Sequence, residues 1–340
     1  MKNCLRFLLC AAVFSFQTLI SHASHIVGGE MSYECLGNND YTLTLKIYRD
    51  CFNGLAAYDD PAYVFIFDAN GTNVQTLSIP FPGSDTLPNN ANDPCLIVPP
   101  GICVEEAVYT FNVNLPPLEG GYSLVYVRCC RNNSITNIVD PMNTGATYLA
   151  VIPDSALAEC NSSPAFNNFP PTVICVNQPL SFDHSATDAD GDSLVYELCA
   201  PFVGASSLDP QPLPGTPPPP PPYGFVTFLS PYSATDPLGG NPPMAIDPTT
   251  GLLTATPTTV GQFVVGVCVT EYRNGVLLSE HKRDFQFNVT TCQPSVIAST
   301  PNIVNNCSSS TITFENNSFG GTIYHWDFGI DGIDSDTSNE

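Results

Sequence analysis

The sequence predicts an all-β fold of tandem, disulfide-stapled β-sandwich domains. Apolar and polar residues alternate in short runs with a period of two, which is typical of strands that bury one face. The 33 prolines and 24 glycines separate these runs and mark turns. Of the 14 cysteines, 12 follow an N-terminal leader, and an even number in an exported chain favours a disulfide framework.

Residues 1–23 have the layout of a cleavable secretory signal peptide. Lys2 and Arg6 precede an apolar stretch that ends near the small residues Ser21 and Ala23, so we expect cleavage after Ala23. The apolar stretch is shorter than the roughly 20 residues that a membrane-spanning helix needs. No later apolar run reaches that length either, so we expect a secreted or cell-surface protein whose mature chain has no membrane-spanning segment. Disulfides persist in such an oxidising environment.

Composition limits the classes of function. The 340 residues suffice for two or three domains, and the formal net charge is −23. Such an acidic surface repels nucleic acid and attracts cations. Because 43% of the residues are hydrophobic and only 12% are charged, we expect a folded protein and not an acidic disordered chain. We therefore expect no nucleic acid as a partner.

The first expected domain, residues 24–155, is a cysteine-rich β-sandwich. Alternate side chains from Tyr41 to Ile47 share one face of a strand, and Asp68-Ala69-Asn70-Gly71 is a hairpin signal between two apolar runs. The strands expected here are Tyr41–Tyr48, Tyr63–Phe67, Thr72–Ile79, Val108–Val113, Tyr122–Arg128 and Thr147–Ile152.

The second expected domain, residues 160–292, contains a proline-rich insertion at 208–223. Its six consecutive prolines, Pro217–Pro222, favour an extended polyproline II conformation that cannot join a sheet ladder. We interpret the insertion as a stiff loop in preference to a ligand for a proline-recognition module. The expected strands are Pro171–Val176, Ser193–Leu198, Gly224–Leu229, Leu252–Thr256, Gln262–Thr270 and Asp284–Thr290.

The last segment, residues 295–340, holds two or three expected strands. These are too few for a closed sandwich, so we expect an incomplete domain. Tyr324, Trp326 and Phe328 alternate and would share one face of a strand. The pattern fits a core strand, which we favour, and also a sugar-stacking platform.

The cysteines are candidates for disulfides, and their spacing does not determine the pairs. No C-x-x-C pair occurs, which disfavours a cysteine-bound metal. We expect the neighbours Cys129 and Cys130 to bond different partners and to staple neighbouring strands, with a redox-active dipeptide as the alternative. The candidates are Cys35, Cys51, Cys95, Cys103, Cys129, Cys130, Cys160, Cys175, Cys199, Cys268, Cys292 and Cys307.

The best candidate for a ligand site is Asp188-Ala189-Asp190-Gly191-Asp192. Three carboxylates at alternate positions around a glycine turn offer oxygen ligands to a hard cation such as calcium. Asp183, Glu197 and Glu271 are further ligands if strand ends bring them together. The alternative is an acidic turn that is merely solvated.

Catalytic signatures are absent from the sequence. It contains neither an H-E-x-x-H zinc motif nor a G-x-S-x-G nucleophile motif. Chance carboxylate pairs are frequent among 32 acidic residues, so spacing selects no glycosidase pair. We therefore predict that the protein is not an enzyme.

Three stretches resemble the N-terminal region of large secreted proteins from gliding, Bacteroidota-type bacteria. They are SHIVGGEMSYECLGNNDYTLTLKIYRDCFNG (Ser24–Gly54), VYVRCCRNNSITNIV (Val125–Val139) and NSSPAFNNFPPTVICVNQP (Asn161–Pro179). Such proteins commonly carry polycystic-kidney-disease (PKD) repeats and a gliding-motility-associated sorting domain for type IX secretion. The resemblance implies the type IX export machinery as a partner.

The second expected domain resembles the cadherin-like repeats of bacterial surface proteins, which are immunoglobulin-like sandwiches. The matching stretches are ATDADGDSLVYEL (Ala186–Leu198) and IDPTTGLLTATPTTVGQFVVGVCVTE (Ile246–Glu271). Those repeats usually have Asp where this chain has Glu271. The resemblance implies that calcium is bound by Asp188, Asp190, Asp192 and Glu271.

The end segment FENNSFGGTIYHWDFGIDG (Phe314–Gly332) resembles the start of a PKD repeat. These resemblances predict an exported, non-catalytic structural or adhesive protein of the cell surface, which binds glycans or proteins and is stiffened by calcium. The alternative is an accessory region of a secreted polysaccharide- or protein-degrading enzyme whose catalytic domain lies beyond residue 340. A narrower alternative is a carbohydrate-binding module in Ser24–Pro153.

Overall fold

The computed structural model describes residues 26–54, 56–88, 96–97, 100–294, 296–300, 315–321, 323–327 and 337–338. The expected signal peptide, Cys95, Cys307 and Phe328 lie outside this part of the chain. Its regular structure is almost entirely β, the exception being a 3-10 turn at Pro141–Asn143. The predicted all-β, disulfide-linked sandwich fold is therefore confirmed. None of the described helices is long and apolar enough to cross a bilayer.

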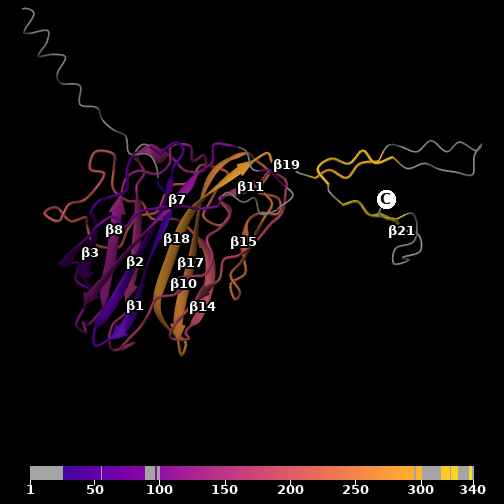
Figure 1. Ribbon diagram of the computed structural model, residues 1–340. Coiled ribbons are helices and arrows are strands. Elements are labelled where there is room, and N and C mark those ends of the chain that lie inside the picture. Colours follow the sequence, from indigo (N-terminus) through magenta and orange to yellow (C-terminus); the bar gives the residue numbers. More distant parts are fainter. Residues whose placement is uncertain are drawn as a thin grey trace, which may run out of the picture.

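One large sheet and one smaller sheet form most of the molecule (Figure 1). The large sheet has eight strands, seven of them in the order β14 (Ser193–Cys199), β17 (Gly261–Arg273), β18 (Val276–Thr290), β1 (Ile26–Gly37), β2 (Asp40–Asp50), β7 (Val104–Asn114) and β5 (Asp85–Thr86). The eighth, β11 (Val173–Cys175), pairs in parallel with β18. The four-stranded sheet has the order β4 (Asn73–Ile79), β3 (Ala62–Asp68), β8 (Tyr122–Arg128) and β9 (Ala146–Ile152).

Short strands complete the fold. A three-stranded sheet has the order β12 (Leu180–Asp183), β16 (Leu252–Ala255) and β15 (Ala245–Ile246). The two-stranded pairs are β10 (Ala165–Phe166) with β13 (Ala186–Thr187), β19 (Gln293–Pro294) with β6 (Leu96–Ile97), and β20 (Trp326–Asp327) with β21 (Thr337–Ser338).

The large sheet is continuous across the two segments that the sequence divides near residues 155–160. Strand β1 pairs with β18, with Gly29 opposite Asp284 and Glu30 opposite Arg283. Figure 1 shows the indigo strands of the first half beside the orange strands of the second. The strands approach closely because β1 has glycine here: a Cβ on Gly28 would lie 2.2 Å from the Asp284 carbonyl oxygen.

A buried ion pair reinforces this junction. The Arg283 guanidinium donates hydrogen bonds of 2.9 and 2.7 Å to the two carboxylate oxygens of Glu30. Both side chains are almost fully buried, and burial without a partner would be costly for either charge. The junction between the halves is therefore a specific polar contact as well as a strand pairing.

Each half has its own hydrophobic cluster. The expected alternation from Tyr41 to Ile47 is present in β2, whose alternate side chains pack against β3, β8 and β9. In the second half, Leu180 and Leu253 from the three-stranded sheet pack against Phe263 and Phe285 from the large sheet. The halves are thus two sandwich cores that share one sheet.

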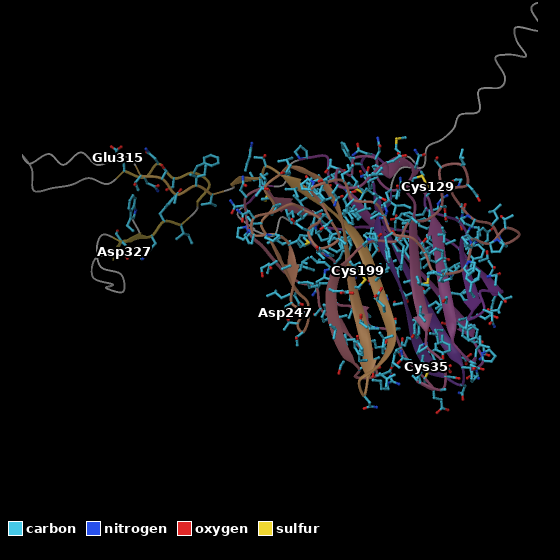
Figure 2. All side chains as sticks on the ribbon, turned by 180° about the vertical axis from the view of Figure 1, so that it is seen from behind. Cys35, Cys129, Cys199, Asp247, Glu315 and Asp327 are labelled. Atoms are coloured by element: carbon cyan, nitrogen blue, oxygen red, sulfur yellow. A yellow bond between two sulfur atoms is a disulfide. The ribbon has the colours of Figure 1, made fainter. Side chains whose placement is uncertain are left out.

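Five disulfides join the ten candidate cysteines that the structure describes. They are Cys35–Cys160, Cys51–Cys103, Cys129–Cys130, Cys175–Cys292 and Cys199–Cys268. The expectation that Cys129 and Cys130 bond different partners is wrong. They bond each other, and the other eight described cysteines pair among themselves. Figure 2 shows Cys35 and Cys129 toward opposite ends of the first half.

The proline-rich insertion at 208–223 contains no strand and docks on the first half. Phe65 and Phe67 of β3 point to the outer face of the four-stranded sheet, where Ala205 and Tyr223 pack against them. In Figure 1 this loop is the salmon-coloured segment that extends beyond β3 and β8. We call residues 203–224 the proline arm. It covers a sheet face that would otherwise expose two phenylalanines.

Candidate metal centre

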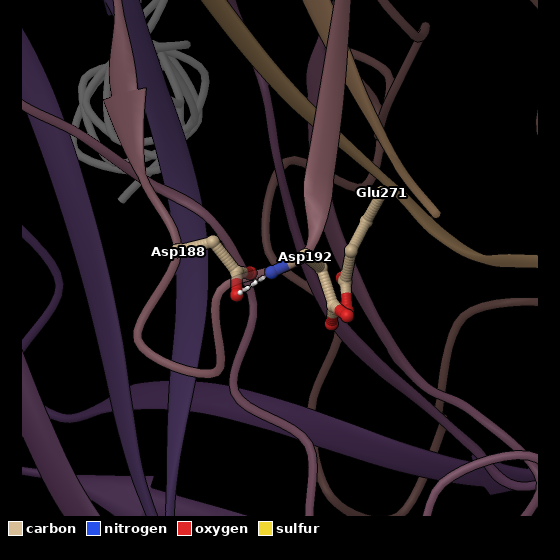
Figure 3. A group of neighbouring side chains, drawn as sticks. All are labelled: Asp188, Asp192 and Glu271. Atoms are coloured by element: carbon tan, nitrogen blue, oxygen red, sulfur yellow. Dashed lines mark hydrogen bonds between the residues drawn. The ribbon is translucent and has the colours of Figure 1, made fainter. Parts of the chain in front are cut away.

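Three of the four expected metal ligands meet at one end of the second half. One carboxylate oxygen from each of Asp188, Asp192 and Glu271 lies within 4.8 Å of the other two. Asp188 and Asp192 belong to the loop that precedes β14, and Glu271 stands near the end of β17, opposite Leu194 of β14. Figure 3 shows the carboxylates of Asp192 and Glu271 side by side, with Asp188 directed toward Asp192.

The loop takes its shape from Asp188. Its Oδ1 atom accepts hydrogen bonds from the backbone N–H groups of Asp190 and Asp192, each 2.9 Å long. Gly191 has a φ of +80°, a left-handed conformation that glycine adopts without steric cost. The Asp-x-Asp-Gly-Asp spacing thus folds the loop back on its first carboxylate, as Asx turns do.

Asp190 does not join the three carboxylates. Its Oδ2 atom accepts a hydrogen bond of 2.6 Å from the backbone N–H of Ser162, in the segment that links the two halves. The same oxygen lies 3.5 Å from the Arg273 guanidinium. The structure therefore makes Asp190 an anchor for the linking segment. The further candidates Asp183 and Glu197 are also outside the three-carboxylate group.

A cation of the chain itself neutralises Asp192. The Arg273 guanidinium donates hydrogen bonds of 2.8 and 2.7 Å to the two oxygens of Asp192, a bidentate pair. These hydrogen bonds lower the pKa of Asp192. Arg273 also donates to Oδ1 of Asn161 at 2.7 Å, so it ties the loop to the linking segment.

The pKa of Glu271 is shifted in the opposite direction. Its side chain is fully buried, and this burial raises its pKa to about 7, with smaller increases from Asp192 and Asp188. Hydrogen bonds from Ser279 Oγ at 2.8 Å and Asn161 Nδ2 at 2.6 Å oppose the increase. Near neutral pH this carboxylate therefore either takes up a proton or gains from a nearby cation.

The donor set fits a hard cation. Carboxylate oxygens are the ligands that calcium prefers, and calcium accepts six to eight oxygens in irregular arrangements. Oδ2 of Asp188 is buried and has no hydrogen-bond partner among the described residues, which leaves an oxygen free to coordinate. Asp188, Asp192 and Glu271 would hold the ion, which would compete with Arg273 for Asp192.

The centre also connects the two halves. Tyr33 of β1 donates its backbone N–H to Ser163 Oγ at 2.9 Å, and its hydroxyl accepts from Asn161 at 3.2 Å. The Cys35–Cys160 disulfide lies next to these contacts in the chain. Asn161 donates to both Glu271 and Tyr33, so a change of charge at Glu271 would alter the contacts of the segment that joins the second half to β1.

Sequence reasoning did not identify Arg273, Asn161 or Ser279 as parts of this centre. Arg273 follows Glu271 by two residues on one strand, and that spacing places both side chains on the same face of a regular strand. This period-two relation was a usable signal. Asn161 and Ser279 reach the centre only through tertiary packing, which no local pattern reveals.

No protein-family model matches the chain, and no curated protein or solved structure matches it either. The chemistry of the described residues is therefore the ground for a functional assignment.

Proposed function

We propose that the protein is an exported structural or adhesive component of the cell surface, which binds glycans or proteins and performs no catalysis. The observation that carries the proposal is the bracing of the molecule: disulfides brace each sandwich core, Cys35–Cys160 ties β1 to the linking segment, and a shared sheet fixes the two cores against each other. Disulfides persist where chaperones and reductants are scarce, and each typically contributes about 2–4 kcal/mol to stability. Such bracing suits a protein that bears load outside the cell.

Calcium belongs to this proposal as a stiffening ligand. Binding at Asp188, Asp192 and Glu271 would stabilise the charged form of a buried carboxylate that is otherwise partly protonated at neutral pH. Asn161 bonds both Glu271 and Arg273, so the ion would also hold the linking segment in place. Extracellular calcium modules commonly bind at about 10⁻⁴ to 10⁻³ M, which weakly charged sites can reach.

Export supports the same assignment. The N-terminal leader and the disulfides favour a secreted or surface location. The resemblance to PKD-containing surface proteins of gliding bacteria adds the type IX machinery as the proposed route.

The non-catalytic part of the proposal rests on how the polar side chains are used. Glu271 and Asp192 are hydrogen-bonded to Asn161, Ser279 and Arg273, and this leaves them poorly placed as a free acid–base pair. His184 and His281 are buried among aromatic rings, away from solvent. These positions favour structural roles.

A binding screen tests the proposal. Oxidised protein from residue 24 to residue 340 is applied to glycan arrays and cell-surface extracts, in calcium and in chelator. We expect binding that weakens in chelator and in Asp188→Asn, while Glu34→Gln, which removes an exposed carboxylate of β1, binds normally. Absence of binding in both conditions would contradict the adhesive role. Binding that is equally strong in calcium and in chelator would contradict the role of calcium.

A further inference from the structure

A cavity of about 480 Å³ lies between the proline arm and the outer face of the four-stranded sheet. Val127 of β8 and Thr147 of β9 form part of its floor, and Val203, Pro217–Pro219 and Tyr223 form walls. Its volume is within the range of about 300–1,000 Å³ that is usual for small-molecule pockets. We call it the arm pocket. It shares no residue with the acidic centre.

Hydrogen bonds hold the arm in place at its base and along one edge. The Thr147 hydroxyl donates to the Val203 carbonyl at 2.6 Å. The Pro210 carbonyl accepts from the Cys129 backbone N–H at 2.9 Å and from the Arg128 guanidinium at 3.0 Å. These bonds fasten the arm to the ends of β8 and β9, which also form the floor of the pocket.

The far part of the arm is fixed by packing. A Cβ on Gly71, in the turn between β3 and β4, would lie 2.9 Å from Cγ of Pro220, so the arm rests directly on that turn. The Tyr223 hydroxyl donates to the Pro219 carbonyl at 2.7 Å and closes the arm on itself. Proline rings restrict the backbone further. The pocket is thus formed before any ligand binds, which lowers the entropic cost of binding.

The lining offers apolar surface and hydrogen-bond acceptors, and its side-chain donors are the hydroxyls of Thr147, Ser206, Thr216 and Tyr223. Prolines have no N–H group, and the Thr147 hydroxyl is already engaged with Val203. Asp209 is the one residue with a formal charge among the described lining residues, and it is exposed to solvent. Its backbone N–H donates to the Ser206 carbonyl at 3.1 Å, which fixes it at the rim. The lining residues that the structure describes include no lysine, arginine or histidine.

We propose that the arm pocket binds a small organic cation, an ammonium group carried on an apolar body. The apolar body would be buried against Val127, Val203 and the proline rings, where removal from water is favourable. The ammonium group would pair with Asp209 and donate to neighbouring carbonyls, which an anion could not do. The net charge of −23 attracts cations toward the surface.

The proposal is tested with three probes of similar size: phenethylammonium, 2-phenylethanol and phenylacetate. Binding to residues 24–340 is followed by ligand-observed NMR and calorimetry at two salt concentrations. We expect the ammonium to bind best and phenylacetate worst, and added salt to weaken the ammonium only. Equal affinity for all three probes, or no binding by any, would overturn the proposal.

Variants locate the site. Asp209→Asn should lower the affinity for phenethylammonium about two- to fivefold, which is the range for an exposed ion pair. The affinity for 2-phenylethanol should not change. Thr216→Trp, at an exposed lining position, should fill the pocket and abolish both. Glu34→Gln removes the same charge from β1, outside the pocket lining, and should change neither affinity. Retained binding in Thr216→Trp, with the thermal transition unchanged, would contradict the location.

Discussion

Glu271 shows how one buried carboxylate gives the protein a dependence on pH. Burial raises its pKa from 4.5 to about 7 in the folded state, so the folded protein holds a proton that the unfolded chain releases above pH 4.5. Stability from this group is therefore present at low pH and is lost as pH rises from 4.5 to about 7. Arg273 lowers the pKa of Asp192, so the stability that Asp192 contributes is present near neutral pH and is lost as the pH falls into the acidic range.

The substitution Glu271→Gln tests this residue. Glutamine keeps the shape and cannot ionise, so we expect the variant to be more stable than the native protein by about 1–2 kcal/mol at pH 8 and no more stable at pH 4. Urea unfolding at both pH values, in chelator, measures the difference. A uniform loss of stability at both would contradict the raised pKa.

His184 should cause a loss of stability in acid. Its imidazole is fully buried, and both nitrogens lack a hydrogen-bond partner among the described residues. Burial, and then the Arg283 charge, lower its pKa to about 3. The unfolded chain takes up a proton below about pH 6.5 and the folded chain does not, so stability falls as pH decreases from 6.5 toward 3.

Replacing His184 with phenylalanine should flatten this dependence, because Phe166, Phe182 and Phe285 already surround the ring. We expect the native protein to lose up to about 1.4 kcal/mol per pH unit below pH 6 relative to His184→Phe. Thermal unfolding from pH 7 to pH 4 compares the two. If stability depends on pH in the same way in both proteins, the pKa of His184 is not lowered in the folded state.

Particular residues explain what could be predicted at this scale. Asp188, Asp192 and Glu271 were identified from the spacing of acids around a glycine turn and from the cadherin-like resemblance, and they do lie together. Asp190 has the same spacing, but its carboxylate bonds Ser162. That partner comes from a segment 28 residues earlier, and the pattern contains no information about it.

At the scale of elements, the β1–β18 pairing depends on Gly28. A Cβ at Gly28 would meet backbone atoms of Asp284, which cannot rotate away as a side chain can. We expect Gly28→Ala to lower the unfolding free energy by about 2–4 kcal/mol through overpacking at the pairing. Gly215→Ala is the control, because a Cβ there meets no atom within 4 Å. Equal stability of the two variants in urea would contradict the close approach.

The elements with clean alternation were the easiest to predict. The expected strand Tyr41–Tyr48 is contained in β2, and the expected hairpin around Asp68–Gly71 joins β3 to β4. The docking of the proline arm was not predicted. The nearly continuous apolar run in β3 was a signal for it, because a strand with two apolar faces needs cover on both.

At the scale of the whole molecule, the all-β class followed from composition and period, whereas the shared sheet did not. Gly29 and Asp284 are 255 residues apart, and no local pattern encodes the pairing of edges so distant in sequence. The disulfide pairs were likewise open until the strands were placed. The alternation pattern of a strand does not specify which distant strand it pairs with.

The shared sheet predicts cooperative unfolding. Since β18 belongs to the core of the second half and pairs with β1 of the first, we expect calorimetry of the oxidised protein to show one main transition for both halves. The calorimetric and van't Hoff enthalpies of that transition should agree. Two separate transitions, each with its own enthalpy, would show that the halves unfold independently.

The most direct test of the account is a calcium titration of residues 24–340 at pH 7, followed by calorimetry in two buffers of different ionisation enthalpy. We predict that calcium binds, that each ion releases about half a proton from Glu271 because a group with a pKa of about 7 is half protonated at pH 7, and that Glu271→Gln loses the proton release. Calcium should also raise the thermal midpoint, as a ligand of the folded state does. The absence of calcium-dependent heat, with an unchanged midpoint, would contradict a calcium-stiffened junction at Asp188, Asp192 and Glu271.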